Sequence, residues 1–135
     1  MKNAVRLLVA SCMGFSAACG GAVDCEMSYA YTQGDLATCN TEKMLGLTAS
    51  ECDDATQYPC YVVETTDPDV VDCAKVVTCP TDRLLASCDF SMWTHVVGDF
   101  EVTQSWYEGD GEDATCAYTE GICDALGGTF TCYSE

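Results

Sequence analysis

The stretch FSMWTHVVGDFEVTQSWY, residues 90–107, carries the clearest strand signal in the chain. β-Branched and aromatic residues dominate it, and Gly98-Asp99 suits a two-residue turn because glycine tolerates a positive φ at its first position. We therefore predict a β-hairpin in which Trp93 opposes Gln104. One face of this hairpin is largely apolar and is predicted to form the core; it carries Trp93, His95, Val97, Phe100, Val102 and Trp106.

Two more strands are predicted after the hairpin, at residues 114–119 and 129–133. Between them, residues 124–128 are typical of a helical turn that glycine ends. The pentapeptide AYTQG at residues 30–34 recurs as AYTEG at residues 117–121. Chance and a shared strand-turn unit both explain this recurrence.

Before the hairpin, short helical turns are predicted at residues 41–46, 48–51 and 83–88. A short helix is also expected to begin at Pro68, with Asp67 as its N-cap. The apolar residues that follow Pro68 have helical spacing, which favours this helix over a strand.

Ten cysteines follow the first two dozen residues, and no two of them form a C-x-x-C pair. Redox-active motifs and zinc ribbons need such close pairs, so both are disfavoured. An even number of dispersed cysteines predicts five structural disulfides, which form in oxidising compartments outside the cytosol. The predicted fold class is a small disulfide-rich α+β or mostly β domain, with an antiparallel meander in the C-terminal half and short helical turns before it. The disulfide-forming residues are predicted to be Cys25, Cys39, Cys52, Cys60, Cys73, Cys79, Cys88, Cys116, Cys123 and Cys132.

The N-terminus has the layout of a signal peptide. Lys2 and Arg6 precede an apolar run over residues 7–18, and no acidic residue appears before Asp24. A membrane-spanning helix needs about 20 apolar residues, and this run is shorter. We therefore predict export from the cytoplasm, with residues 1–18 as the signal peptide and residues 25–135 as a single cysteine-rich domain.

The AAC sequence at residues 17–19 resembles the end of a bacterial lipoprotein signal, in which small residues precede a cysteine that is lipidated and becomes the new N-terminus. The resemblance implies lipid attachment at Cys19 and a short tether over residues 19–24. The domain would then be anchored to a membrane of the bacterial envelope. Cleavage after Ala22 is the alternative, and it would release a soluble secreted protein.

The chain is strongly acidic, with 22 Asp and Glu against 5 Lys and Arg and a formal net charge of −17 at pH 7. Without Lys2 and Arg6 this charge becomes −19. Such a chain has no basic patch to displace counterions from phosphates, so nucleic acid is excluded as a predicted partner. Self-repulsion destabilises the compact state, and disulfides offset it by about 2–4 kcal/mol each.

Few residues are candidates for chemistry. His95 is the single histidine, so any histidine-dependent catalysis would use it, although we expect it to pack on the apolar hairpin face. The loop at residues 108–113 combines carboxylates with glycines, and calcium takes about 6–8 oxygen ligands from such loops. No other cofactor is expected. The calcium candidates are Glu108, Asp110, Glu112 and Asp113.

These features favour a non-catalytic binding or interaction module outside the cytoplasm, with a protein or a carbohydrate as its partner. One alternative is a small secreted enzyme of the hydrolase type that uses His95 with nearby carboxylates. The other is an inhibitor-like scaffold, in which a loop pinned by disulfides loses little entropy on binding. Residues 60–73 and 88–116 are the candidates for such a loop.

Overall fold

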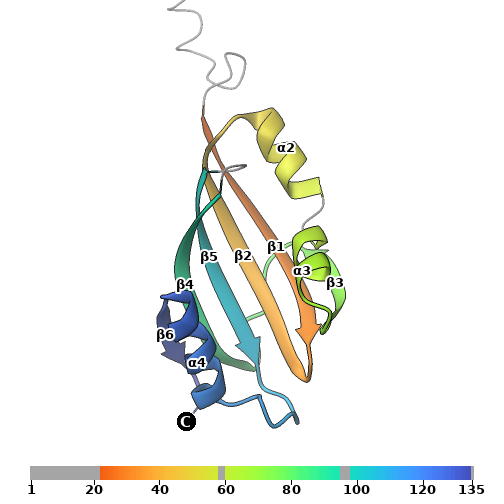
Figure 1. The fold of residues 1–135 in the computed structure, drawn as a ribbon, viewed down its shortest axis with the longest axis vertical. Coiled ribbons are helices and arrows are strands. Elements are labelled where there is room, and N and C mark those ends of the chain that lie inside the picture. Colours follow the sequence, from red (N-terminus) through yellow and green to blue (C-terminus); the bar gives the residue numbers. More distant parts are fainter. Residues whose placement is uncertain (1–21, 58–59, 95–97, 135) are drawn as a thin grey trace, which may run out of the picture.

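The computed structural model describes residues 22–57, 60–94 and 98–134, which form a six-stranded antiparallel sheet with helices on one side (Figure 1). Neighbouring strands follow the order β3-β1-β2-β5-β4-β6. The predicted class, a small disulfide-rich and mostly β domain, is confirmed. The strands are β1 (Val23–Gln33), β2 (Leu36–Leu47), β3 (Val70–Val76), β4 (Leu84–Thr94), β5 (Gly98–Tyr107) and β6 (Thr129–Cys132), and the helices are α2 (Ala49–Gln57), α3 (Tyr61–Thr66) and α4 (Cys116–Leu126).

The strand order is symmetric about its centre because the chain forms two units of the same topology. In the first unit, residues 23–76, the β1–β2 hairpin is followed by α2, α3 and then β3, which pairs with the outer edge of β1. In the second unit, residues 84–132, the β4–β5 hairpin is followed by α4 and then β6, which pairs with the outer edge of β4. The units meet where β2 pairs with β5, so this ladder completes the sheet.

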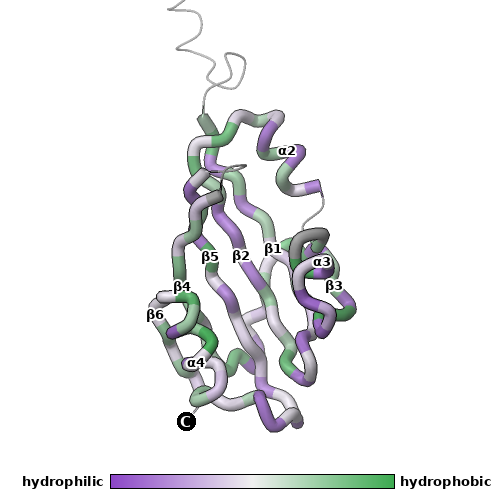
Figure 2. Tube along the Cα trace, viewed as in Figure 1, coloured by the Kyte–Doolittle hydropathy of each residue, from purple (hydrophilic) through white to green (hydrophobic). Residues whose placement is uncertain are grey.

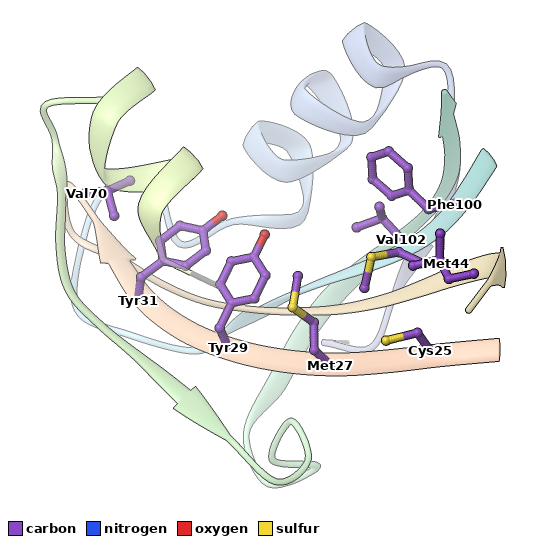
Figure 3. Packing of buried hydrophobic residues seen from close by; sticks show 9 residues of the cluster. Cys25, Met27, Tyr29, Tyr31, Met44, Val70, Phe100 and Val102 are labelled. Atoms are coloured by element: carbon purple, nitrogen blue, oxygen red, sulfur yellow. The ribbon is translucent and has the colours of Figure 1, made fainter. Parts of the chain in front are cut away.

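Side-chain alternation along the strands gives the sheet two different faces. Tyr29, Asn40 and Gln104 are neighbours in the register of β1, β2 and β5. The face that carries this row is called the helical face, because α2, α3 and α4 cover it; Figure 3 shows its apolar side chains pointing to that side. The opposite face is called the open face, and it carries Ser28, Ala30, Cys39, Thr41, Ser87, Asp89, Thr103 and Ser105.

Two apolar clusters pack between the helical face and the helices. The first lies mainly in the first unit, yet it includes Phe100 and Val102 from β5. The second lies mainly in the second unit around the fully buried Trp106, yet it includes Leu36 from β2. Complete burial of a large apolar side chain is worth about 1.5–3 kcal/mol. Each unit therefore contributes apolar side chains to the core of the other, and this noncovalent packing holds the two units together.

The disulfides staple each unit separately. In both units, one disulfide ties the first strand to a helix and another ties the start of a helix to the last strand. Among the disulfides of the described residues, none links the first unit to the second. Disulfides at this density indicate an oxidising, extracytoplasmic environment. The pairs are Cys25–Cys52 and Cys60–Cys73 in the first unit, Cys88–Cys123 and Cys116–Cys132 in the second, and Cys39–Cys79 between β2 and the connection that joins the units.

Residues 77–83, called here the crossing segment, lead from β3 at one edge of the sheet to β4 across the open face (Figure 1). Cys79 fastens this segment to Cys39 of β2. The Tyr107 hydroxyl donates a hydrogen bond of 2.9 Å to the Pro80 carbonyl. The crossing segment therefore lies against the open face over β2 and β5, toward the end where β2 begins and β5 ends.

The predicted hairpin is present, but its predicted register is wrong. Trp93 pairs with Asp99 and not with Gln104, because β5 already begins at Gly98. The shift is by an odd number of residues, so it moves Trp93 from the helical face to the open face, where 59% of the residue is exposed. Of the other residues predicted on the core face, Phe100, Val102 and Trp106 are buried, whereas His95 and Val97 lie outside the described residues.

Several predicted elements have the other secondary structure. Residues 41–46 and 83–88 lie mostly in β2 and β4. Val70–Val76 forms β3, and Asp67 is the C-cap of α3 instead of an N-cap. The valines of this segment are β-branched, and pairing with β1 decides for the strand. Residues 114–119 are mainly helical, since Thr115 caps α4 by accepting a hydrogen bond from the Tyr118 amide.

Two predicted helical turns are confirmed. The turn at residues 48–51 begins α2, where the side chains of Thr48 and Glu51 accept hydrogen bonds from each other's backbone amides, which is a capping box. The turn at residues 124–128 ends α4 at Gly127, whose φ of 69° is left-handed. The two recurring pentapeptides do not share a structure, because residues 30–34 end β1 and residues 117–121 lie in α4.

Limited proteolysis tests whether the units are joined only by noncovalent contacts and the crossing segment. Trypsin should cut first after Arg83, whose side chain is 71% exposed. We expect the nicked protein to elute at the native size, because the β2–β5 ladder and the exchanged core residues hold the units together. On a non-reducing denaturing gel, it should separate into two fragments. Fragments that stay joined until reduction would contradict the disulfide arrangement.

Candidate functional site

The open face is lined by short polar side chains that bond to one another across the strands. The hydroxyls of Ser28 and Thr41 are 2.9 Å apart, and the Thr103 hydroxyl donates to the Asp89 carboxylate at 2.6 Å. No helix covers these residues in the described part of the chain. The middle of this face is covered, since Ser28, Ser87 and Ser105 are buried. Asp89, Ser91 and Glu101 are exposed, so this part of the face is available for contact with a partner.

A first hollow, called the carboxylate hollow, lies on the open face between β4 and β5. It measures about 290 Å³, and Asp89 and Glu101 line it together with the hydroxyls of Ser91 and Thr103. Trp93 follows two residues after Ser91 and therefore projects from the same face beside this hollow. Two carboxylates therefore line the hollow, and an exposed aromatic residue lies beside it.

A second hollow, called the alanine hollow, lies at the opposite end of the open face. It measures about 340 Å³, and its lining includes Ala30, Ala37 and Ala74 from three neighbouring strands. Asp72 and Tyr107 also line it. Burial raises the pKa of Tyr107, so the hydroxyl keeps the proton that it donates to the crossing segment.

Negative charge dominates the surface around both hollows. Lys43 lies on the open face, and its ammonium is 3.6 Å from Asp24. Arg83 lies 3.9 Å from Glu108. Lys75 pairs with Tyr29 in the sheet register and therefore belongs to the helical face. Among the described residues, the few cations thus leave the carboxylates of the hollows in excess, and this surface attracts positive charge.

The helical face carries a buried polar cluster between its two apolar clusters. β2 is hydrophilic along its middle, as Figure 2 shows. The Tyr29 hydroxyl donates to the Glu42 carboxylate at 2.6 Å, and the Asn40 amide donates to Tyr29 at 3.1 Å. The amides of Asn40 and Gln104 both reach the Tyr31 hydroxyl at 3.5 Å. This network connects the strands of both units at their junction.

The acid–base properties of this cluster follow from its burial. Burial raises the pKa of Tyr29 far above its usual range, and the neighbouring Glu42 carboxylate adds to the shift. Burial also raises the pKa of Tyr31 to about 12. Glu42 itself has a raised pKa because burial disfavours its charge, although the bond from Tyr29 opposes this. Both tyrosines therefore stay protonated at neutral pH and act as hydrogen-bonding groups that fix the strands.

The residues predicted for catalysis and lipid attachment, His95 and Cys19, lie outside the described residues. The two predicted inhibitor loops take regular structure: residues 60–73 contain α3 and the start of β3, and residues 88–116 contain most of the β4–β5 hairpin. No helix among the described residues is long and apolar enough to cross a membrane.

The calcium candidates lie in the exposed connection after β5. In the described part of the chain, no three of these carboxylates come together as a ligand group; the grouped residues are Cys60, Glu64 and Cys73, and this group's two sulfurs form a disulfide. Gly111 packs closely on the β1–β2 turn, where an added Cβ would lie 2.5 Å from the Cβ of Asp35. This glycine therefore serves packing. The candidates were Glu108, Asp110, Glu112 and Asp113.

The residues of the two hollows were missed by the sequence analysis. Trp93 was expected in the core, and Asp72 and Tyr107 were not connected to each other. The alternation of the polar Asp89 and Ser91 with the apolar Phe90 and Met92 was a signal for an open face, but the predicted hairpin register placed Trp93 in the core. The chain matches no protein family, no curated protein and no solved structure.

Replacing Glu42 by Gln should stabilise the protein at neutral pH. Because the folded-state pKa of Glu42 is raised, the folded state binds this proton more tightly than the unfolded chain does. The free energy of unfolding therefore falls as pH rises through the folded pKa, and E42Q removes this loss. We expect a higher Tm for E42Q than for the wild type at pH 7 and equal values near pH 3. The exposed Glu120→Gln serves as control, and an equal gain there would contradict the assignment.

Proposed function

We propose that this protein is a non-catalytic binding module that works outside the cytoplasm and binds a positively charged protein segment on its open face. The observation that carries the proposal is that an aromatic residue lies beside the carboxylates of one hollow and within the other hollow of this face. Trp93 accompanies Asp89 and Glu101, and Tyr107 accompanies Asp72.

The chemistry of such pairs fits Lys and Arg side chains. A cation over the face of an aromatic ring gains about 0.5–1 kcal/mol at an exposed site. Carboxylates add charge-assisted hydrogen bonds to the same group. The net charge of −17 extends this attraction beyond contact distance and speeds the encounter with a basic partner.

The arrangement of the opposite face supports a role without catalysis. Tyr29 and Tyr31 belong to the apolar cluster that packs against α2 and α3, and disulfides hold these helices in place. Glu42 is hydrogen-bonded to Tyr29, so these groups support the fold. The open face is rigid for two reasons. Disulfides on the helical side tie its strands to the helices, and Cys39–Cys79 fixes the crossing segment. Rigid surfaces lose little conformational entropy on binding.

Binding of a labelled basic peptide tests this proposal. We expect the wild type to bind a peptide of alternating Arg and Gly, and affinity should fall with added salt. The double variant D89N/E101Q should bind about 3–10-fold more weakly, as expected for the loss of two exposed charge pairs. The control E120Q/D124N removes the same charge from α4, on the other side of the sheet. Equal weakening in both variants, or equal binding of a Glu/Gly peptide, would refute a specific open-face site.

The proposal includes lipid attachment at Cys19. β1 begins at Val23, so Val23 and Asp24 of the expected tether belong to the first strand. The four residue-to-residue steps from Cys19 to Val23 span at most about 14 Å. The register places the start of β1 and Trp93 at the same end of the sheet, so a lipid anchor would hold this end close to the bilayer.

Intact mass after expression in a bacterial host tests the anchor. We expect a chain that begins at Cys19 and carries acyl groups, with the ten remaining cysteines protected from alkylation until reduction. Cys19→Ala should abolish the acyl mass and release the protein from the membrane fraction. A wild-type chain that begins near Val23 without lipid would instead show a diffusible secreted protein.

A further inference from the structure

We infer that the alanine hollow is a subsite for the guanidinium group of an Arg side chain. The inference deepens the proposed function and rests on it, because it assigns to one hollow a particular group of the basic partner. The observations behind it are the shape of the hollow, the backbone that places its carboxylate, and the position of its aromatic ring.

The hollow exists because small side chains meet there. Ala30 pairs with Ala74 across β1 and β3, and Ala37 follows on β2. These three alanines form a floor where longer side chains would fill the space above the sheet. The resulting volume of about 340 Å³ exceeds that of one side chain, so the methylene stem of an Arg can lie on this apolar floor.

A β-bulge in β3 places the charged group of the hollow. The register shifts between Ala30 and Thr32, so Asp72 and Cys73 together oppose a single residue of β1. Asp72 has a left-handed φ of 57°, which Asp tolerates better than most residues. Cys73 bonds to Cys60 on the helical side, while Asp72 lines the alanine hollow on the open side. The bulge thus directs two consecutive side chains to the two faces.

Tyr107 supplies the wall of the hollow. Its hydroxyl donates to the Pro80 carbonyl at 2.9 Å, which fixes the ring against the crossing segment. A planar guanidinium stacks on an aromatic face and also donates hydrogen bonds in its own plane. The ring of Tyr107 and the carboxylate of Asp72 offer both contacts within one hollow. An ammonium group can use the charge but not the stacking, so Arg is preferred to Lys.

Two variants change the hollow in different ways. Asp72→Asn removes the charge but keeps a residue that tolerates left-handed backbone. Ala30→Leu fills the space while it leaves every charge in place. Asp124→Asn and Ala125→Leu make the same changes on the exposed surface of α4 and serve as controls. The circular dichroism and thermal unfolding of each variant show whether it is folded.

The measurement is fluorescence anisotropy of labelled Arg/Gly and Lys/Gly peptides with the full chain. We expect D72N and A30L each to weaken the Arg/Gly peptide about 5–10-fold, with a smaller effect on Lys/Gly and none from the controls. If D72N binds Arg/Gly as D124N does, the subsite is refuted while the proposed function stands. If the wild type binds neither peptide, the proposed function fails as well. If A30L does not fold, the comparison of D72N with D124N alone decides.

Discussion

Seven register pairs, from Thr38–Trp106 to Met44–Phe100, join β2 to β5, and the rest of the structure depends on this ladder. Without it, each unit would expose the side chains that it now exchanges, Phe100 and Val102 in one direction and Leu36 in the other. The buried Asn40 and Gln104 lie opposite each other at the centre of the ladder. Both amides donate hydrogen bonds to the Tyr31 hydroxyl. These polar contacts help to fix the register of β2 against β5, in addition to the apolar packing.

The sequence predicted the class of the fold better than its details. An even number of dispersed cysteines was sufficient to predict the disulfide-rich class, because redox motifs and zinc sites need cysteines that are close in sequence. The pairing of the cysteines depended on which strands are neighbours, and local sequence does not contain this information. Val70–Val76 illustrates the limit: its valines fit helical spacing, yet pairing with β1 decides for a strand. Local propensity is a weak prior where tertiary contacts compete with it.

The candidate site was predicted least well, for a related reason. The hairpin register decides the face to which Trp93 belongs, and the sequence around Gly98 does not specify this register well. A register shift by an odd number of residues moves every side chain of the strand to the opposite face. The alanine hollow is formed by residues from β1, β2, β3, β5 and the crossing segment, so no local sequence motif predicts it. The net acidity, in contrast, was readable at once, and it is consistent with the carboxylates that line both hollows.

The repeated topology also bears on how such a chain can arise. The first strands of the two units contain similar tetrapeptides, Cys-Glu-Met-Ser at residues 25–28 and Cys-Asp-Phe-Ser at residues 88–91. A gene duplication that fused two copies of an ancestral homodimer, paired through its second strands, would leave this arrangement. In the ancestor, symmetry would have made the two ends of the open face identical. Fusion would release them from that constraint, so each end could acquire its own ligand group. In this chain, three alanines and Asp72 line one hollow, whereas Asp89 and Glu101 line the other.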